Sequence, residues 1–112
     1  MNVTCENRNG IGVVRVIGPL MASSVDEFTR VFWPWYPQSG CRNVVLDLSD
    51  MDALDSTGLG TLVVSLKYVS EKGGDMKIAH LQKRPRLVFE ITRSYKVFEI
   101  FDSLDEALKA AT

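Results

Sequence analysis

Hydrophobic residues recur along the chain with two alternating periods, which indicates that strands and helices follow one another. Five short apolar runs have the pattern of strands, at residues 3–6, 11–17, 43–48, 76–79 and 97–101. Four stretches carry apolar residues at helical spacing, and they begin near Ser24, Ser56, Pro85 and Ser103. The pattern predicts an α/β domain in which helices cover a central mixed sheet of about four to five strands.

Local signals set the expected ends of these elements. Asn9-Gly10 is a strong hairpin signal, so the first two strands should pair antiparallel. Residues 24–27 and 103–106 both fit capping boxes, in which a serine hydroxyl and a glutamate begin a helix. Pro34 should stop or kink the first helix, because its ring clashes with the carbonyl of the preceding turn.

Composition limits the class of protein. A chain of 112 residues is long enough for one domain, residues 1–112, which can bury a core without disulfides. Its 13 basic and 14 acidic residues give a net charge of −1, which argues against direct binding of nucleic acid. Cys5 and Cys41 are too few for a disulfide framework, and no export signal or membrane-spanning run is visible. We expect a cytoplasmic protein without membrane insertion, and no sequence motif calls for a metal or a cofactor.

The most informative segment lies between the third expected strand and the helix that follows it. Asp55 and Ser56 are both good N-cap residues for that helix, because their oxygens can accept its free amide protons. Gly58 and Gly60 then occupy the first turns, where each costs about 1 kcal/mol relative to alanine. The bare backbone indicates either close packing against the sheet or close approach by a partner.

The run from Asp55 to Gly60, DSTGLG, resembles the signature of bacterial anti-sigma factor antagonists, which are single STAS domains. Three further segments, residues 12–18, 44–49 and 97–103, are similar to the second strand, the third strand and the C-terminal segment of that family. The resemblance covers nearly the whole chain and implies the STAS fold.

The same resemblance implies a switch that regulates transcription. Ser56 matches the serine that a partner anti-sigma factor, which is also a serine kinase, phosphorylates in that family. The unphosphorylated protein binds the anti-sigma factor and frees the sigma factor, and a separate serine phosphatase resets the cycle. The expected partner contacts are Asp55, Ser56, Thr57, Gly58, Leu59, Gly60 and Met21. The family implies no catalytic residue, and any homodimer should be weak.

Two positions depart from the family pattern. The loop after the second strand carries Pro19 and Met21 where an acidic residue is usual, which bears on the identity of the partner. Arg93 stands where a helix-ending glycine is common, so the end of the third helix should be strained or reshaped.

Other functions compete with this interpretation. The main alternative is a STAS accessory subunit of a membrane transporter or a signalling scaffold, although a purely structural role needs no accessible hydroxyl at Ser56. His80 could share one sheet edge with Ser56, which would suggest a hydrolase, but no G-x-S-x-G elbow or third residue supports it.

An aromatic cluster and a basic cluster each allow a structural and a functional interpretation. The aromatic cluster at residues 32–36 fits core and rim better than a binding patch, with one of the indoles of Trp33 and Trp35 turned towards solvent. The basic residues Lys83, Arg84 and Arg86 fit a solvated face.

Overall fold

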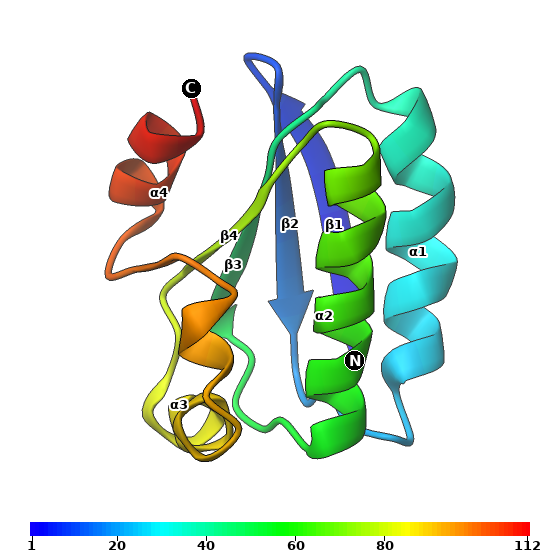
Figure 1. Cartoon of the computed structure of the whole chain (residues 1–112). Coiled ribbons are helices and arrows are strands. Elements are labelled where there is room, and N and C mark those ends of the chain that lie inside the picture. The colour runs from blue at the N-terminus through cyan, green and yellow to red at the C-terminus, as the bar shows by residue number, and fades with distance from the viewer.

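The computed structural model describes all residues from Met1 to Thr112 and contains one five-stranded sheet (Figure 1). The strands occur in the spatial order of the chain, β1-β2-β3-β4-β5. β1 pairs antiparallel with β2, and every other pair is parallel. The strands are β1 (Asn2–Arg8), β2 (Ile11–Ile17), β3 (Val44–Asp50), β4 (Met76–Ala79) and β5 (Ile100–Phe101). This is the mixed sheet that the sequence pattern predicts.

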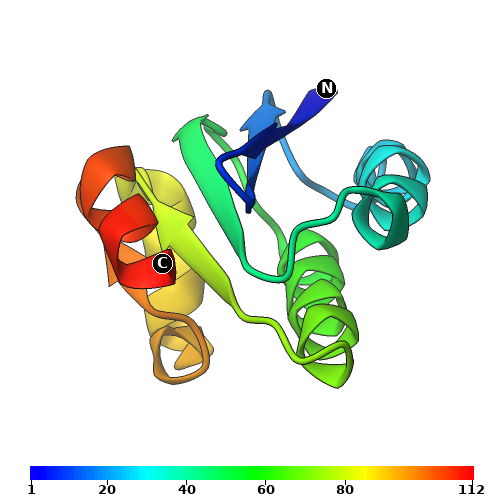
Figure 2. The ribbon, with the colours of Figure 1, turned by 90° about the horizontal axis from the view of Figure 1, so that it is seen from above.

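Helices cover both faces of the sheet (Figure 2). α1 and α2 pack on one face and enclose the larger core, whereas α4 packs on the other over a smaller cluster that includes Val45 and Ala79. The helices are α1 (Val25–Gln38), α2 (Ser56–Glu71), α3 (Lys83–Ile91) and α4 (Leu104–Ala111), with a 3-10 turn η1 (Ser94–Lys96) after α3.

The β1–β2 hairpin confirms the turn prediction. Asn9 and Gly10 both have positive φ angles, 54° and 90°, which is the conformation of the two-residue type I′ turn. The Asn7 side chain accepts a hydrogen bond from the Gly10 amide (2.8 Å) and donates one to the Ser39 carbonyl (2.8 Å). The turn is thereby fastened to the end of α1.

The prediction that Pro34 stops the first helix is wrong, since α1 continues to Gln38 with Pro34 and Pro37 inside it. Both prolines are exposed, so they lie on the outer face of the helix, where water can satisfy a carbonyl that loses its backbone donor. On the inner face, Phe28, Phe32 and Tyr36 stack in sequence, with ring centroids 5.4 and 5.8 Å apart. Their burial outweighs the local cost of the prolines.

Neither tryptophan of α1 is fully exposed or fully buried, and both pack against the larger core. The Trp33 ring lies parallel to that of Tyr68 on α2, with centroids 4.6 Å apart, and its Nε1 donates a hydrogen bond to Ser65 Oγ (3.1 Å). The expectation that one indole turns out to solvent at a helix break is therefore not met, because there is no break.

Four other local predictions have mixed outcomes. Ser24 is the N-cap of α1, but its hydroxyl donates to the Pro19 carbonyl and does not cap the helix, so the first capping box does not form. The Ser103 hydroxyl does cap α4, since it accepts from the Glu106 amide (3.2 Å) and donates to the Glu106 carboxylate (3.3 Å), but the return bond from the Ser103 backbone amide that completes a capping box is not formed. β5 is only two residues long. Arg93 adopts the left-handed conformation (φ 59°) that a glycine would favour there, which confirms the reshaped end of α3.

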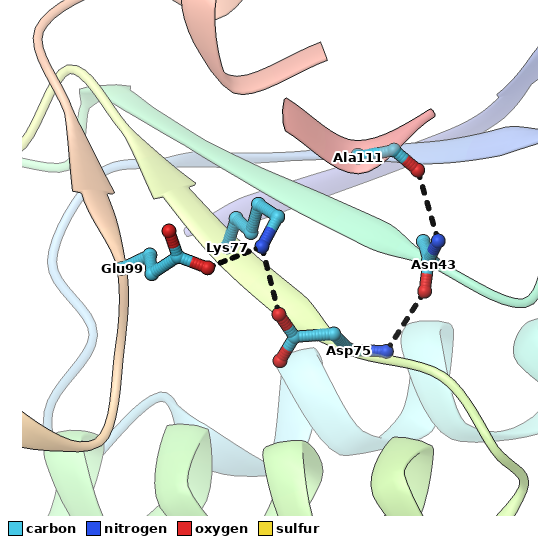
Figure 3. A network of polar contacts seen from close by, with 5 residues as sticks. All are labelled: Asn43, Asp75, Lys77, Glu99 and Ala111. Carbon is cyan, nitrogen blue, oxygen red and sulfur yellow. Dashed lines mark hydrogen bonds and ion pairs between the residues drawn. The ribbon is translucent and has the colours of Figure 1, made fainter. Parts of the chain in front are cut away.

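A polar network joins the starts of β3 and β4 to α4 and to the segment before β5 (Figure 3). The buried Lys77 ammonium donates to Asp75 (2.9 Å) and Glu99 (2.6 Å). Burial alone would lower the pKa of Lys77, but these carboxylates outweigh it and raise the pKa. Asn43 donates to the Ala111 carbonyl (2.9 Å) and accepts from the Asp75 amide (3.0 Å). The network holds the edge of the sheet opposite to the carboxyl ends of its parallel strands.

Candidate functional site

The candidate site lies at the carboxyl ends of β2 and β3, where two loops continue the pairing of the strands. The Gly18 amide donates to the Asp50 carbonyl (2.9 Å), and the Leu20 amide donates to the Ala53 carbonyl (2.9 Å). Leu20 and Leu54 form an isolated parallel bridge. The loop after β2 is therefore bound along the loop that leads into α2.

Asp55 connects these loops to the first turn of α2. As the N-cap residue, it accepts a hydrogen bond from the Gly58 amide on Oδ1 (2.8 Å), and its Oδ2 accepts one from the Ala22 amide (2.9 Å). The bond from Ala22 is the largest cause of a lowered pKa at Asp55, followed by the bond from Gly58. Of the two cap candidates in the sequence, Asp55 caps the helix, so the hydroxyl of Ser56 is not needed for this role.

Ser56 and Thr57 open α2, and both are exposed. Their hydroxyls therefore stand at the amino end of a helix of 16 residues, where the helix dipole favours an added negative charge. Exposure alone does not separate the two hydroxyls as acceptors of a phosphate.

The two glycines of the motif have different surroundings. A Cβ on Gly58 would lie 2.0 Å from the Leu20 carbonyl oxygen, so only glycine lets the loop after β2 approach the helix. Gly60 is exposed, and a Cβ there would meet no atom within 4 Å. Close packing thus explains Gly58, although the neighbour is a loop and not the sheet, and nothing within the chain requires glycine at position 60.

The other residues of the expected partner surface differ in accessibility. Leu59 is buried in the larger core, with 4% of its surface exposed. Met21 and Asp55 are half-buried. Of the expected partner contacts, Ser56, Thr57 and Gly60 are therefore exposed, and Met21 and Asp55 are partly accessible.

A shallow groove between α1 and α2 begins at this motif, which the sequence pattern did not reveal. It has a volume of about 440 Å³ and is lined by Thr29, Trp33, Thr57, Gly60, Thr61 and Val64. Gly60 has no side chain to fill the groove, and Trp33 lines it from α1. Glycine spacing within α2 and the aromatic residue of α1 are the only traces of it in the sequence.

His80 forms no hydrogen bond with Ser56 and is bound to the start of α4 instead. Its Nε2 accepts a hydrogen bond from the Leu104 amide at the start of α4 (3.3 Å), and α4 covers the opposite face of the sheet from α2. His80 has a left-handed backbone (φ 58°), which directs the chain from β4 towards α3. The structure gives it a role in positioning α4.

No group of three or more His, Cys, Asp or Glu side chains is arranged to hold a metal ion. None of the helices has the length and apolar character that crossing a membrane requires.

Comparison with known proteins gives one consistent result. A family model described as "STAS domain" matches residues 2–107. The chain is 30% identical over 92 residues to an anti-sigma-B factor antagonist of Staphylococcus aureus, covering 82% of this chain and 84% of that protein. It is 24% identical over 108 residues to an anti-sigma F factor antagonist of Paenibacillus polymyxa, covering 96% and 92%. The crystal structure of an anti-sigma factor antagonist from Mycobacterium paratuberculosis superposes with a TM-score of 0.87 at 24% identity, covering 98% and 92%.

Alanine at the two glycines should have opposite effects on stability. Gly58→Ala should lower the free energy of unfolding by about 1–3 kcal/mol, because its methyl group displaces the paired Leu20 carbonyl. Gly60→Ala should raise it by up to ~1 kcal/mol, because alanine is the better helix former and has free space there. Urea unfolding followed by circular dichroism measures both. Similar effects of the two substitutions would contradict the packing role of Gly58.

The stabilising effect of Asp55 should depend on pH. Its pKa is lower in the folded chain than the ordinary value of 3.8, so its contribution is present above that value and is lost as pH falls through the lower folded pKa. Asp55→Asn should be less stable than the wild type at neutral pH, because one amide oxygen cannot replace both carboxylate oxygens. The gap should narrow below about pH 4 in urea unfolding.

Asp52→Asn, a matched change at an exposed carboxylate of the same loop, is the control for that experiment. A gap between the wild type and Asp55→Asn that stays constant from neutral to acidic pH would show that the charge of Asp55 does not stabilise the fold.

Proposed function

The chain belongs to the STAS domain family, and from this premise we propose that it is an anti-sigma factor antagonist whose partner binding is switched by phosphorylation of Ser56. The observation that carries the proposal is the exposed Ser56 hydroxyl, placed directly after the capping Asp55 at the amino end of α2. The relatives named anti-sigma factor antagonists support an anti-sigma factor as the partner.

A phosphate on Ser56 is compatible with the fold. The contacts that hold the two loops together use Asp55, Gly58 and Leu20, and none of them uses the Ser56 side chain. The amino end of α2 supplies a favourable field for the phosphate. Modification can therefore act on the surface without unfolding the domain.

The same phosphate would change how the surface meets a partner. It adds nearly two negative charges beside the Asp55 carboxylate, whose lowered pKa keeps it ionised at neutral pH, and near the exposed Asp52. A partner docked over Ser56 would have to desolvate these negative charges or place its own negative charges close to them, and both are unfavourable. The unphosphorylated form is thus the form that binds, and a serine phosphatase would restore it.

The groove between α1 and α2 offers the neighbouring contact surface. Thr57 and Gly60 line it, so a partner segment that enters the groove passes within one helical turn of Ser56. A glycine without any role in internal packing lets the backbone of such a segment come close to α2. Modification at Ser56 and occupation of this groove would then exclude one another.

In this function Ser56 is a substrate of another protein's kinase, and the chain itself catalyses no reaction. A serine nucleophile needs a base within hydrogen-bonding reach, and the only histidine is bound to α4. Asp55 adjoins Ser56, but its lowered pKa makes it a poor base near neutral pH.

Incubation with the cognate kinase and ATP should place a phosphate on Ser56. Peptide mass spectrometry should find the modification in the wild type and in Thr57→Ala, and should find none in Ser56→Ala. Thr57→Ala is the matched control, because its hydroxyl is equally exposed in the next position. Modification confined to Thr57, or none by a kinase that binds the chain, would refute the assignment.

The sign of the switch is measured by calorimetry with the anti-sigma factor. Ser56→Ala should bind as the wild type does, whereas Ser56→Asp should bind more weakly by at least ~1 kcal/mol, about fivefold in Kd, because like charges gather beside Asp55. Ser70→Asp adds the same charge at an exposed position near the other end of α2 and should leave the affinity unchanged. Equal affinities of Ser56→Ala and Ser56→Asp would contradict the proposed mechanism.

A further inference from the structure

Exposed apolar side chains are concentrated on α3 and the turn that follows it. Six large hydrophobic residues are exposed in the whole chain, and four of them lie within eleven consecutive residues: Leu87, Ile91, Tyr95 and Val97. We call these four residues the α3–η1 strip. The exposed fraction reaches 82% at Ile91 and 57% at Leu87.

The strip is held in place by a well-packed inner side. Pro85 and Phe89 of α3 are buried, and the Phe89 ring meets that of Phe98 edge to face, with centroids 5.9 Å apart. Leu87 and Ile91 are four residues apart, so they project together from the outer side of the helix. The apolar surface is therefore a fixed feature of the fold.

Positive charge surrounds the strip. Residues 83–97 contain five basic residues and one acidic residue, a net charge of +4, whereas the remaining 97 residues contain eight basic and 13 acidic, a net charge of −5. The basic residues are Lys83, Arg84, Arg86, Arg93 and Lys96. None of these five forms an ion pair in the structure. The total charge is close to zero, but positive charge is concentrated in residues 83–97 and negative charge in the rest of the chain.

The shape of this surface limits what it can bind. α3 and η1 form an outer corner of the molecule (Figure 1), and no residue of the strip lines any of the four hollows of the surface. The hollow lined by Lys83, Arg84 and Pro85 is polar, so the apolar side chains of the strip have no pocket of their own in which a protein partner could anchor. A lipid bilayer needs no pocket, because apolar tips enter it while the surrounding cations meet its headgroups.

We propose that the α3–η1 strip docks the domain peripherally on an anionic lipid surface. Leu87, Ile91, Tyr95 and Val97 enter the boundary between headgroups and acyl chains, and the five basic side chains contact the anionic headgroups. Lys83 and Arg84 also share a hollow with Asp50 and Asp52, so the positive charge available to the headgroups is greatest on the side of Arg93 and Lys96. The proposal concerns adsorption and not a membrane span, and it does not depend on the role of Ser56.

The test is co-sedimentation of the full chain with vesicles of phosphatidylglycerol and phosphatidylcholine in roughly a 1:2 ratio, against vesicles of phosphatidylcholine alone. The wild type should bind the anionic vesicles and lose binding when salt rises from ~0.1 to ~0.5 M. Ile91→Ser should lower the partition coefficient at least ~5-fold, and Arg84→Glu by a similar factor. Both positions are exposed, so the fold should tolerate the changes.

Matched controls lie on α2. Val63→Ser removes another exposed apolar side chain and Lys67→Glu reverses another exposed charge, and both should bind the anionic vesicles as the wild type does. Absence of wild-type binding, or equal loss in the α2 variants, would overturn the proposal. The proposal would also be overturned if the chain bound poly-glutamate, a soluble acidic polypeptide, and did not bind the vesicles. The surface would then recognise acidic protein.

Discussion

The Asp55 carboxylate is the contact on which the arrangement of the site depends. Its two oxygens bind backbone amides from two segments that are far apart in sequence, the Gly58 amide in α2 and the Ala22 amide in the loop after β2. One ionised group thereby caps a helix and fixes a loop. Because hydrogen bonds to a carboxylate are stronger than those between neutral groups, the pair defines the geometry around Ser56 more firmly than a serine cap could. Ser56 is left exposed as a result.

Much of the fold could be predicted because its signals are local and periodic. The alternation of strand and helix patterns predicted the order of elements, and Asn9-Gly10 predicted the hairpin that starts the sheet. The failure at the first helix has a physical cause, since tertiary burial outweighs a local preference. The inward stack of Phe28, Phe32 and Tyr36 carries α1 through Pro34.

The Ser24 hydroxyl fails to cap α1 for a different reason, because it meets a competing backbone acceptor in the loop just before the helix. It bonds to the Pro19 carbonyl (2.8 Å) because the loop returns close to the start of α1. A capping-box pattern in the sequence contains no information about such a neighbour, which comes from an earlier turn of the chain.

Only part of the arrangement around the motif could be predicted from the sequence. DSTGLG predicted the position of the candidate site, but the sequence left open which residue caps α2 and why two glycines follow. The Ala22 amide binds Asp55, and the Leu20 carbonyl approaches Gly58. Both partners lie more than thirty residues earlier in the chain and contribute only backbone atoms to these contacts. Backbone groups carry no residue-specific signal, so their partners become visible only in three dimensions. The groove beside Gly60 was missed for a related reason, since it is formed by two helices that the sequence describes separately.

The use of backbone atoms in the loop after β2 has a consequence for how such domains diversify. The loop is fastened through the Gly18, Leu20 and Ala22 amides, while the side chains of Ala22 and Ser23 are exposed and that of Met21 is half-buried. Mutation can therefore change the exposed side chains of this loop without breaking the backbone hydrogen bonds that hold it. Proteins that share these backbone contacts can in this way acquire different partners, because recognition evolves on the side chains while the main-chain contacts that hold the loop are preserved.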